Sequence, residues 1–137
     1  MNPCDKILCK VFICEVVMKI IIAGSRSIKD YEFVKRCIEN SPFKITEVVC
    51  GMADGVDILG KQYAEEKGLL VKEFPANWKS DGRKIAGFIR NEKMAKYADG
   101  LILIWDGKSK GSKDMLKRAI KHKILIDNYD STQLRLF

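Results

Sequence analysis

Residues 18–26 read Met-Lys-Ile-Ile-Ile-Ala-Gly-Ser-Arg, an apolar run that ends at a glycine and continues into small and basic side chains. Four similar apolar runs follow along the chain, at residues 45–50, 69–74, 101–105 and 124–126. Three of the five runs are nearly continuous in Ile, Val and Leu, as expected for strands that helices cover on both faces. The pattern therefore predicts parallel strands buried inside a sheet.

Segments with helical periodicity separate these runs. The clearest covers residues 56–67, and its apolar face consists of Val56, Leu59, Gly60, Tyr63 and Ala64. Further helices are predicted at residues 30–39, with Asp30 as N-cap, at 83–97 and at 112–121. This alternation predicts an α/β fold with a Rossmann-like, doubly wound, mostly parallel five-stranded sheet and helices on both faces. Right-handed crossovers favour the strand order 3-2-1-4-5, which brings the loops after the first four strands to one edge.

The length of 137 residues suffices for one domain and is too small for two ordinary ones. We expect residues 18–137 to form a single domain that binds a nucleotide ligand, and residues 1–17 to be an extension outside it. The longest uncharged stretch of that extension, residues 11–14, is too short for a signal sequence or a membrane span. The sequence therefore predicts no membrane partner.

The five cysteines form no C-x-x-C pair, and their number is odd. This usage argues against a disulfide framework and against a zinc site, and it predicts a cytoplasmic location. The formal net charge of +7 favours anionic partners, which include nucleic acids, free nucleotides and acidic membranes. Charge alone does not choose among them.

The loops after the predicted strands contain the candidate ligand-binding residues. After the first strand, Gly24 allows close approach, Ser25 offers a hydroxyl group and Arg26 can bind two phosphate oxygens. A plain turn with a solvated arginine would look the same in isolation. The first loop is therefore a weak signal by itself.

The loop after the second predicted strand leads directly into the clearest helix. Its candidates are Gly51, Ala53, Gly55 and Asp57. Backbone N–H groups and the positive end of the helix dipole favour an anion in such a loop. Two roles fit Asp57, which either complements the dipole or accepts a ribose hydroxyl. Asp54 disfavours a phosphate in this loop.

Candidates continue after the third and fourth strands. Asn77 and Trp78 follow the third strand, and the indole either stacks on a base or holds the loop on the core. Arg90 and Asn91 lie in the next predicted helix, within reach of the strand ends. The loop after the fourth strand offers a second helix amino terminus, with Asp106, Gly107, Ser109, Gly111 and Ser112. The pattern identifies no catalytic residue and no metal site.

The last predicted helix has a basic face, formed by Lys110, Lys113, Lys117 and Lys121. A solvated face is the usual explanation for such a stripe, and nucleic-acid binding is the alternative. The single histidine, His122, has no catalytic partner nearby in the sequence and is interpreted as a surface residue.

Six motifs resemble, in the correct order, those of the YspA or cpYpsA-related members of the SLOG superfamily, which are small phage and bacterial proteins. They are residues 19–26, 51–57, 74–78, 89–91, 94–95 and 105–112. The resemblance implies a Rossmann-like fold related to the cytokinin-activating phosphoribohydrolases and to DprA. It also implies a nucleotide or nucleotide-derived small-molecule ligand at the matching positions, with no other cofactor. Because related folds commonly build sites between subunits, a homo-oligomer is expected.

Two departures from the related patterns bear on activity. The phosphoribohydrolases resemble one another in a Pro-Gly-Gly-x-Gly-Thr-x-x-Glu motif, whose glutamate is implicated in cleaving the N-glycosidic bond. Here Asp114 is the only acid near that position, so enzyme activity is not carried over. The second departure is Asp54, where relatives often have a basic side chain.

Three functions are compatible with the sequence. The leading one is a binding protein that senses or sequesters a nucleotide-derived ligand. The second is a hydrolase of nucleotides or nucleoside monophosphates that uses Asp57, Asp106 or Asp114. The third is DprA-like binding of single-stranded nucleic acid, with the basic face of the last helix and Trp78 or Trp105 as stacking platforms.

Overall fold

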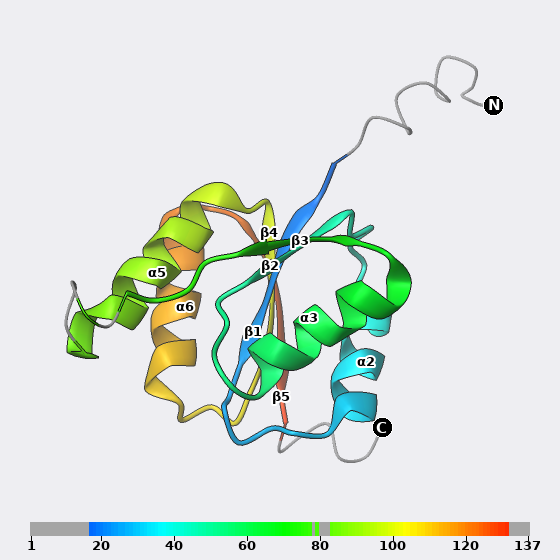
Figure 1. Cartoon of the computed structure of the whole chain (residues 1–137), viewed down its shortest axis with the longest axis horizontal. Helices are drawn as coiled ribbons and strands as arrows, with labels where there is room; N and C mark the ends of the chain where they lie inside the picture. The colour runs from blue at the N-terminus through cyan, green and yellow to red at the C-terminus, as the bar shows by residue number, and fades with distance from the viewer. Residues whose placement is uncertain (1–16, 78, 80–82, 132–137) are drawn as a thin grey trace.

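A single parallel sheet organises the computed structural model, which describes residues 17–77, 79 and 83–131 (Figure 1). The elements follow one another as β1 (Lys19–Gly24), α2 (Tyr31–Asn40), β2 (Glu47–Cys50), α3 (Val56–Lys67), β3 (Leu70–Glu73), α5 (Arg83–Tyr97), β4 (Gly100–Trp105), α6 (Lys110–Lys121) and β5 (Leu125–Asp130). The strand order is β3-β2-β1-β4-β5, and every neighbouring pair is parallel. The predicted α/β fold and strand order are confirmed.

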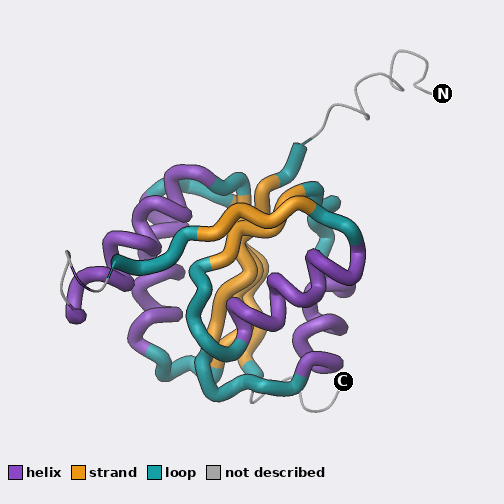
Figure 2. Tube along the Cα trace, viewed as in Figure 1, coloured by secondary structure: helices purple, strands orange, loops and turns teal. Residues whose placement is uncertain are grey.

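Helices cover both faces of the sheet, which explains the continuous apolar runs. In β1, Ile20 and Ile22 face α2 and α3, whereas Ile21 and Ala23 face α5 and α6. The two pairs of helices lie on opposite sides of the strands (Figure 2). Successive residues of a strand point to opposite faces of the sheet, and helices cover both faces. Residues 20–23 of β1 therefore all have apolar side chains.

The elements differ from the predicted ones mainly at their ends. α6 begins at Lys110 instead of residue 112, because the Ser109 side chain caps the helix by accepting from the Ser112 N–H at 3.4 Å. β5 runs on to Asp130, well beyond the apolar run that predicted it. Asp30 caps α2 as expected, since its carboxylate accepts from the Phe33 N–H at 3.3 Å.

The buried side of α6 is narrow. Its buried residues are Ser112, Met115 and Ala119, whereas Ile120 is 60% exposed. A search for helices long and apolar enough to span a membrane finds none in the described part of the chain.

Candidate functional site

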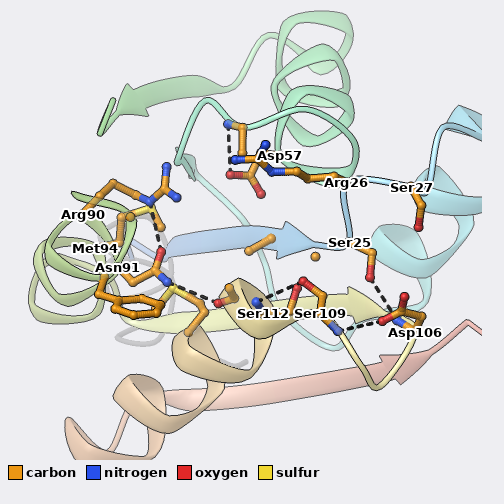
Figure 3. A pocket seen from close by; sticks show the side chains of 17 residues that line it. Ser25, Arg26, Ser27, Asp57, Arg90, Asn91, Met94, Asp106, Ser109 and Ser112 are labelled. Carbon is orange, nitrogen blue, oxygen red and sulfur yellow. Dashed lines mark hydrogen bonds between the residues drawn. The ribbon is translucent and has the colours of Figure 1, made fainter. Parts of the chain in front are cut away.

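A cavity of about 430 Å³ lies at the carboxyl edge of the sheet, between the ends of β1 and β4 and the helices α3, α5 and α6 (Figure 3). The predicted residues that line it are Gly24, Ser25, Arg26, Ala53, Asp57, Arg90, Asn91, Asp106, Ser109, Gly111 and Ser112. Parallel strands explain this convergence, because their carboxyl ends meet at the same edge. Candidates from four separate segments of the sequence therefore share one cavity.

Buried polar side chains are concentrated in this cavity. Among the described residues, the buried polar or charged ones are Ser25, Asp57, Asn91 and Ser112, each at most 5% exposed. All four line the cavity. Burying a polar group costs free energy unless it is compensated, so elsewhere this fold avoids such groups. Their clustering at one place marks a site built for polar interactions.

Two glycines allow the loops to meet. A Cβ at Gly24 would lie 1.7 Å from the carbonyl oxygen of Ile104, so only glycine lets β1 end this close to β4. Gly55 has a φ of 81° and contacts the backbone of Ser25 and Arg26, where a Cβ would lie within 2.7 Å. The loop before α3 therefore closes directly over the loop after β1.

Asp57 is a buried acid in the first turn of α3. Its carboxylate accepts from the Ala53 N–H at 3.3 Å. Burial raises the pKa of Asp57 to about 6, although the nearby positive charge of Arg90 and the hydrogen bond from Ala53 oppose this rise. The site therefore holds a carboxyl group that changes its charge close to neutral pH.

Arg90 connects two walls of the cavity. Its Nη1 donates to the carbonyl oxygen of Gly51, and its Nε donates to the side-chain oxygen of Asn91 at 3.0 Å. Burial lowers the pKa of Arg90, and repulsion by Arg26 adds to this effect although Asp57 opposes it. Two guanidinium groups, those of Arg26 and Arg90, therefore line the cavity near the Asp57 carboxyl group.

We expect the Asp57→Asn variant to be more stable than the wild type at pH 8 but not at pH 4. In the folded protein Asp57 has a raised pKa, so the native state holds its proton more tightly than the unfolded state does. Wild-type stability therefore falls as the pH rises from about 4 to 6, by about 2–3 kcal/mol from this group. Urea denaturation of both proteins across this range measures the effect, and an equal difference at both pH values would contradict it.

Asp106 stabilises the loop in which it lies. Its backbone N–H donates to the Ser25 hydroxyl oxygen at 3.0 Å, and its Oδ1 accepts from the N–H groups of Lys108 at 2.8 Å and Ser109 at 3.0 Å. These last two hydrogen bonds lower the pKa of Asp106. Its carboxylate is thus committed to the loop that precedes α6, a structural role at the cavity wall.

The amino terminus of α6 provides hydrogen-bonding groups to the cavity. Ser112 is 4% exposed, and its buried hydroxyl group has no hydrogen-bond partner within the described part of the chain. Asn91 donates from its amide to the Gly111 carbonyl oxygen at 3.3 Å and to Asp114 at 3.0 Å, which fixes α5 against α6. An unpaired buried hydroxyl at a helix amino terminus is suited to an anionic ligand.

Four predicted residues within the described part of the chain lie outside this cavity. Gly51 lines an adjoining cavity, and Asn77 lines another of about 340 Å³ together with Pro75 and Ala76. Gly55 and Gly107 shape the loops without lining the 430 Å³ cavity, and both have positive φ angles. Trp78 lies outside the described residues.

Sequence reasoning missed several residues that line the cavity. They are Ala23, Ser27, Gly87, Phe88, Met94 and Met115. Gly87 is three residues before Arg90, and Met94 is four residues after it. Both residues therefore lie on the same side of α5 as Arg90. That helical spacing was the signal available in the sequence.

The side chains at the outer end of α5 and α6 form an ionic network. Arg118 donates to Asp114 at 2.8 Å and to Glu92 at 2.9 Å, and His122 lies 2.9 Å from Glu92. The interpretation of His122 as a plain surface residue is therefore wrong, because it is half-buried against Glu92. Glu92 comes from α5, far away in sequence, so the pattern around His122 did not reveal it.

Trp105 is not available as a stacking platform. It is 9% exposed, and its indole N–H donates to the Asn128 side chain at 2.8 Å. The lysines of the basic face on α6 are exposed, as predicted. No group of three or more metal-ligating side chains exists among residues 17–77, 79 and 83–131.

These observations first define a class, a Rossmann-like α/β fold with a polar cavity at the carboxyl edge of its parallel sheet. Residues 18–80 match the model of the YspA, cpYpsA-related SLOG family, which confirms the resemblance for the motifs at residues 19–26, 51–57 and 74–78. The matched stretch includes β1, α2, β2, α3 and β3. No curated protein matches the chain.

Among solved structures, the chain is similar to DNA processing protein A (DprA) from Streptococcus pneumoniae. The TM-score is 0.67 at 17% sequence identity, over 82% of this chain and 50% of that one. The chain thus spans about half the length of that protein. At this identity the similarity establishes the shared fold.

Proposed function

We propose that this protein binds a nucleotide or a nucleotide-derived phosphate ligand in the cavity at the carboxyl edge of its sheet, as a sensor or sequestering protein. The observation that carries the proposal is the gathering of all four buried polar residues of the described chain at this cavity. The match to the SLOG family and the fold shared with a DNA-processing protein support a nucleotide-related role.

The charge of the site favours an anion. Arg26 and Arg90 both line the cavity, together with Asp57 and Asp106. The Asp106 carboxylate already accepts hydrogen bonds from the backbone N–H groups of its own loop. Guanidinium groups bind phosphate oxygens through paired, charge-assisted hydrogen bonds. The positive end of the α6 dipole adds to this attraction. A phosphate group beside Arg26 and Ser112 would pair with the guanidinium group and with the unpaired hydroxyl.

The size of the cavity fits a small-molecule ligand. The cavity of about 430 Å³ falls within the range that is typical of small-molecule sites, roughly 300–1,000 Å³. Phe88, Met94 and Met115 give it apolar wall area, as a base or sugar face requires. Of the two tryptophans considered as stacking platforms for a single-stranded nucleic acid, Trp105 is buried and offers no stacking surface.

Binding is favoured over hydrolysis because two of the three candidate acids are already engaged. Asp114 accepts from Asn91 and Arg118, and Asp106 accepts from its own loop. Asp57 is the remaining candidate for general acid–base catalysis, since it lines the cavity with a pKa near neutral. The hydrolase alternative thus depends on Asp57. It predicts release of free base or ribose phosphate from nucleotides, and loss of that release in Asp57→Asn.

We expect native mass spectrometry and isothermal titration calorimetry to find a bound nucleotide. The protein is purified without added ligand, and the mono- and diphosphates of the four ribonucleosides are then titrated. Arg26→Ala should weaken binding by about 10-fold, because it removes a charge-assisted hydrogen bond to phosphate. Arg36→Ala removes the same charge from the exposed side of α2 and serves as the matched control.

Two results would contradict the proposal. One is the absence of any co-purified ligand together with the absence of heat from every nucleotide in the panel. The other is an equal loss of affinity in both arginine variants, since that would assign the effect to net charge and not to this cavity.

A further inference from the structure

A second cavity adjoins the one described above. It has a volume of about 600 Å³ and lies between the loop after β2 and the loop after β3. The two cavities share Arg26, Ala53 and Arg90, so the arginine side chains stand at the boundary between them. The cavity lined by Ser25 and Ser112 is the inner chamber, and the adjoining cavity is the outer chamber.

The chemistry of the outer chamber differs from that of the inner one. Met52, Pro75 and Ala76 provide apolar surface, and Asp54 adds a carboxylate. A negative charge at this wall repels phosphate and accepts hydrogen bonds from amino or hydroxyl groups. Outside the shared arginines, the outer chamber therefore suits a base or a sugar, not a second phosphate. This assigns a role to Asp54, whose charge argued against a phosphate in its loop.

The backbone of the outer chamber is held in an unusual conformation. Met52 has a φ of 63°, which residues with a side chain rarely adopt. Its N–H donates to the sulfur of Cys50 at 3.3 Å, and the Cys50 thiol lies 3.4 Å from the Asp57 carbonyl oxygen. The loop is thus held in a strained form by the elements beneath it. Strain of this kind occurs preferentially where a loop contacts a ligand.

We propose that the two chambers together bind one ligand made of two nucleoside-like halves joined through phosphate. The phosphates lie at Arg26 and Arg90, one half occupies the inner chamber, and the other half contacts Met52, Pro75 and Ala76. This inference rests on the proposed function, since it uses the same arginines. It adds the class of ligand, a dinucleotide-type molecule instead of a mononucleotide.

The test compares ligands that carry the same number of phosphate groups, although the dinucleoside form has one negative charge fewer. For each ribonucleoside, the 5′-diphosphate is titrated against the corresponding symmetric dinucleoside 5′,5′-diphosphate by calorimetry. We expect the dinucleoside form of at least one base to bind at least about 10-fold more tightly, because its second half buries apolar surface in the outer chamber. This comparison uses the wild-type protein and needs no variant.

A variant then localises the second half of the ligand. Ala76→Trp places a large side chain in the outer chamber, and we expect it to reduce the affinity for the dinucleoside diphosphate to that of the nucleoside diphosphate. Gln62→Trp adds the same side chain on the exposed side of α3 and should retain the wild-type preference. Retention of the preference in Ala76→Trp would overturn the assignment of the outer chamber.

The outcomes separate the two proposals. Equal affinity for both ligand types in the wild type would overturn the inference about the outer chamber and leave the proposed nucleotide binding intact. Absence of binding to every ligand of both types would overturn both. A preference for the dinucleoside form that Ala76→Trp abolishes and Gln62→Trp retains would support both.

Discussion

Replacing Arg90 with methionine is expected to destabilise the protein by about 2–3 kcal/mol at pH 8 and by clearly less at pH 5. Arg90 is the largest influence that opposes the burial of the Asp57 carboxylate. Without Arg90, the pKa of Asp57 rises further. When the pH exceeds this pKa, the fold must bury a carboxylate with less compensating positive charge. At pH 5 the carboxyl group is protonated, so much of this cost disappears. Urea denaturation of the wild type and of Arg90→Met at pH 5 and pH 8 measures this loss of stability.

The double variant Arg90→Met/Asp57→Asn is the control for this mechanism. It removes the buried charge together with its compensating group, so most of the lost stability should return at pH 8. Recovery is incomplete because the carbonyl oxygen of Gly51 still lacks the hydrogen bond from Arg90. If the double variant were as unstable at pH 8 as Arg90→Met, the loss would come from packing and not from charge.

Ligand binding should respond differently from stability. We expect Arg90→Met to weaken nucleotide binding by roughly 10- to 100-fold, and the double variant to remain equally weak, because neither protein has the guanidinium group. Restored stability with unrestored affinity would separate the two roles of Arg90. Full recovery of affinity in the double variant would contradict direct binding of the ligand by Arg90.

Replacing Gly24 with alanine is expected to cost at least about 3 kcal/mol of unfolding free energy, or to prevent folding. The new methyl group would lie 1.7 Å from the Ile104 carbonyl oxygen and 2.9 Å from Val56, so β1 and β4 would have to separate. That separation would also break the hydrogen bond from the Ser25 N–H to Ile104, which is 3.1 Å long.

Gly111→Ala provides a matched control for this prediction. Gly111 also lines the inner chamber, but a Cβ there has no other atom within 4 Å, and the residue lies in the first turn of α6. Alanine favours helix over glycine, so we expect unchanged stability or a gain of up to about 1 kcal/mol. Thermal and urea denaturation compare the two variants. If Gly24→Ala and Gly111→Ala lost the same amount of stability, the close approach of β1 to β4 would not be the cause of the loss in Gly24→Ala.

The local sequence was a good guide to the elements and to their order. Residues 56–67 and 83–97 were predicted with the same bounds that α3 and α5 have. These helices have clear periodicity and, for α3, a glycine directly after the last turn. The strand order could be predicted because handedness and short connections leave few topologies for alternating strands and helices.

The edge strands were harder to predict than the central ones. β5 extends to Asp130 through Asn128 and Tyr129, because pairing with β4 continues where the apolar pattern has ended. β3 lies at the edge of the sheet and is largely exposed although its run is apolar in part. In both cases backbone pairing, and not the side-chain pattern, sets the extent of the strand.

The sequence by itself determined the parallel sheet, the helices on both faces, and the edge at which the candidate loops meet. Continuous apolar runs, helical periodicity and glycines are local properties, and local properties restrict backbone conformation. It also pointed to Arg90 and Asn91, although not to their contacts.

Only the tertiary structure decided which candidates share the inner chamber, which acids are engaged, and that a second chamber lies beyond the arginines. It buried Trp105, joined His122 to Glu92, and placed Asp57 near Arg90. These outcomes depend on distances between residues far apart in the chain, and therefore on the desolvation and charge that each group meets after packing. No local pattern encodes that environment.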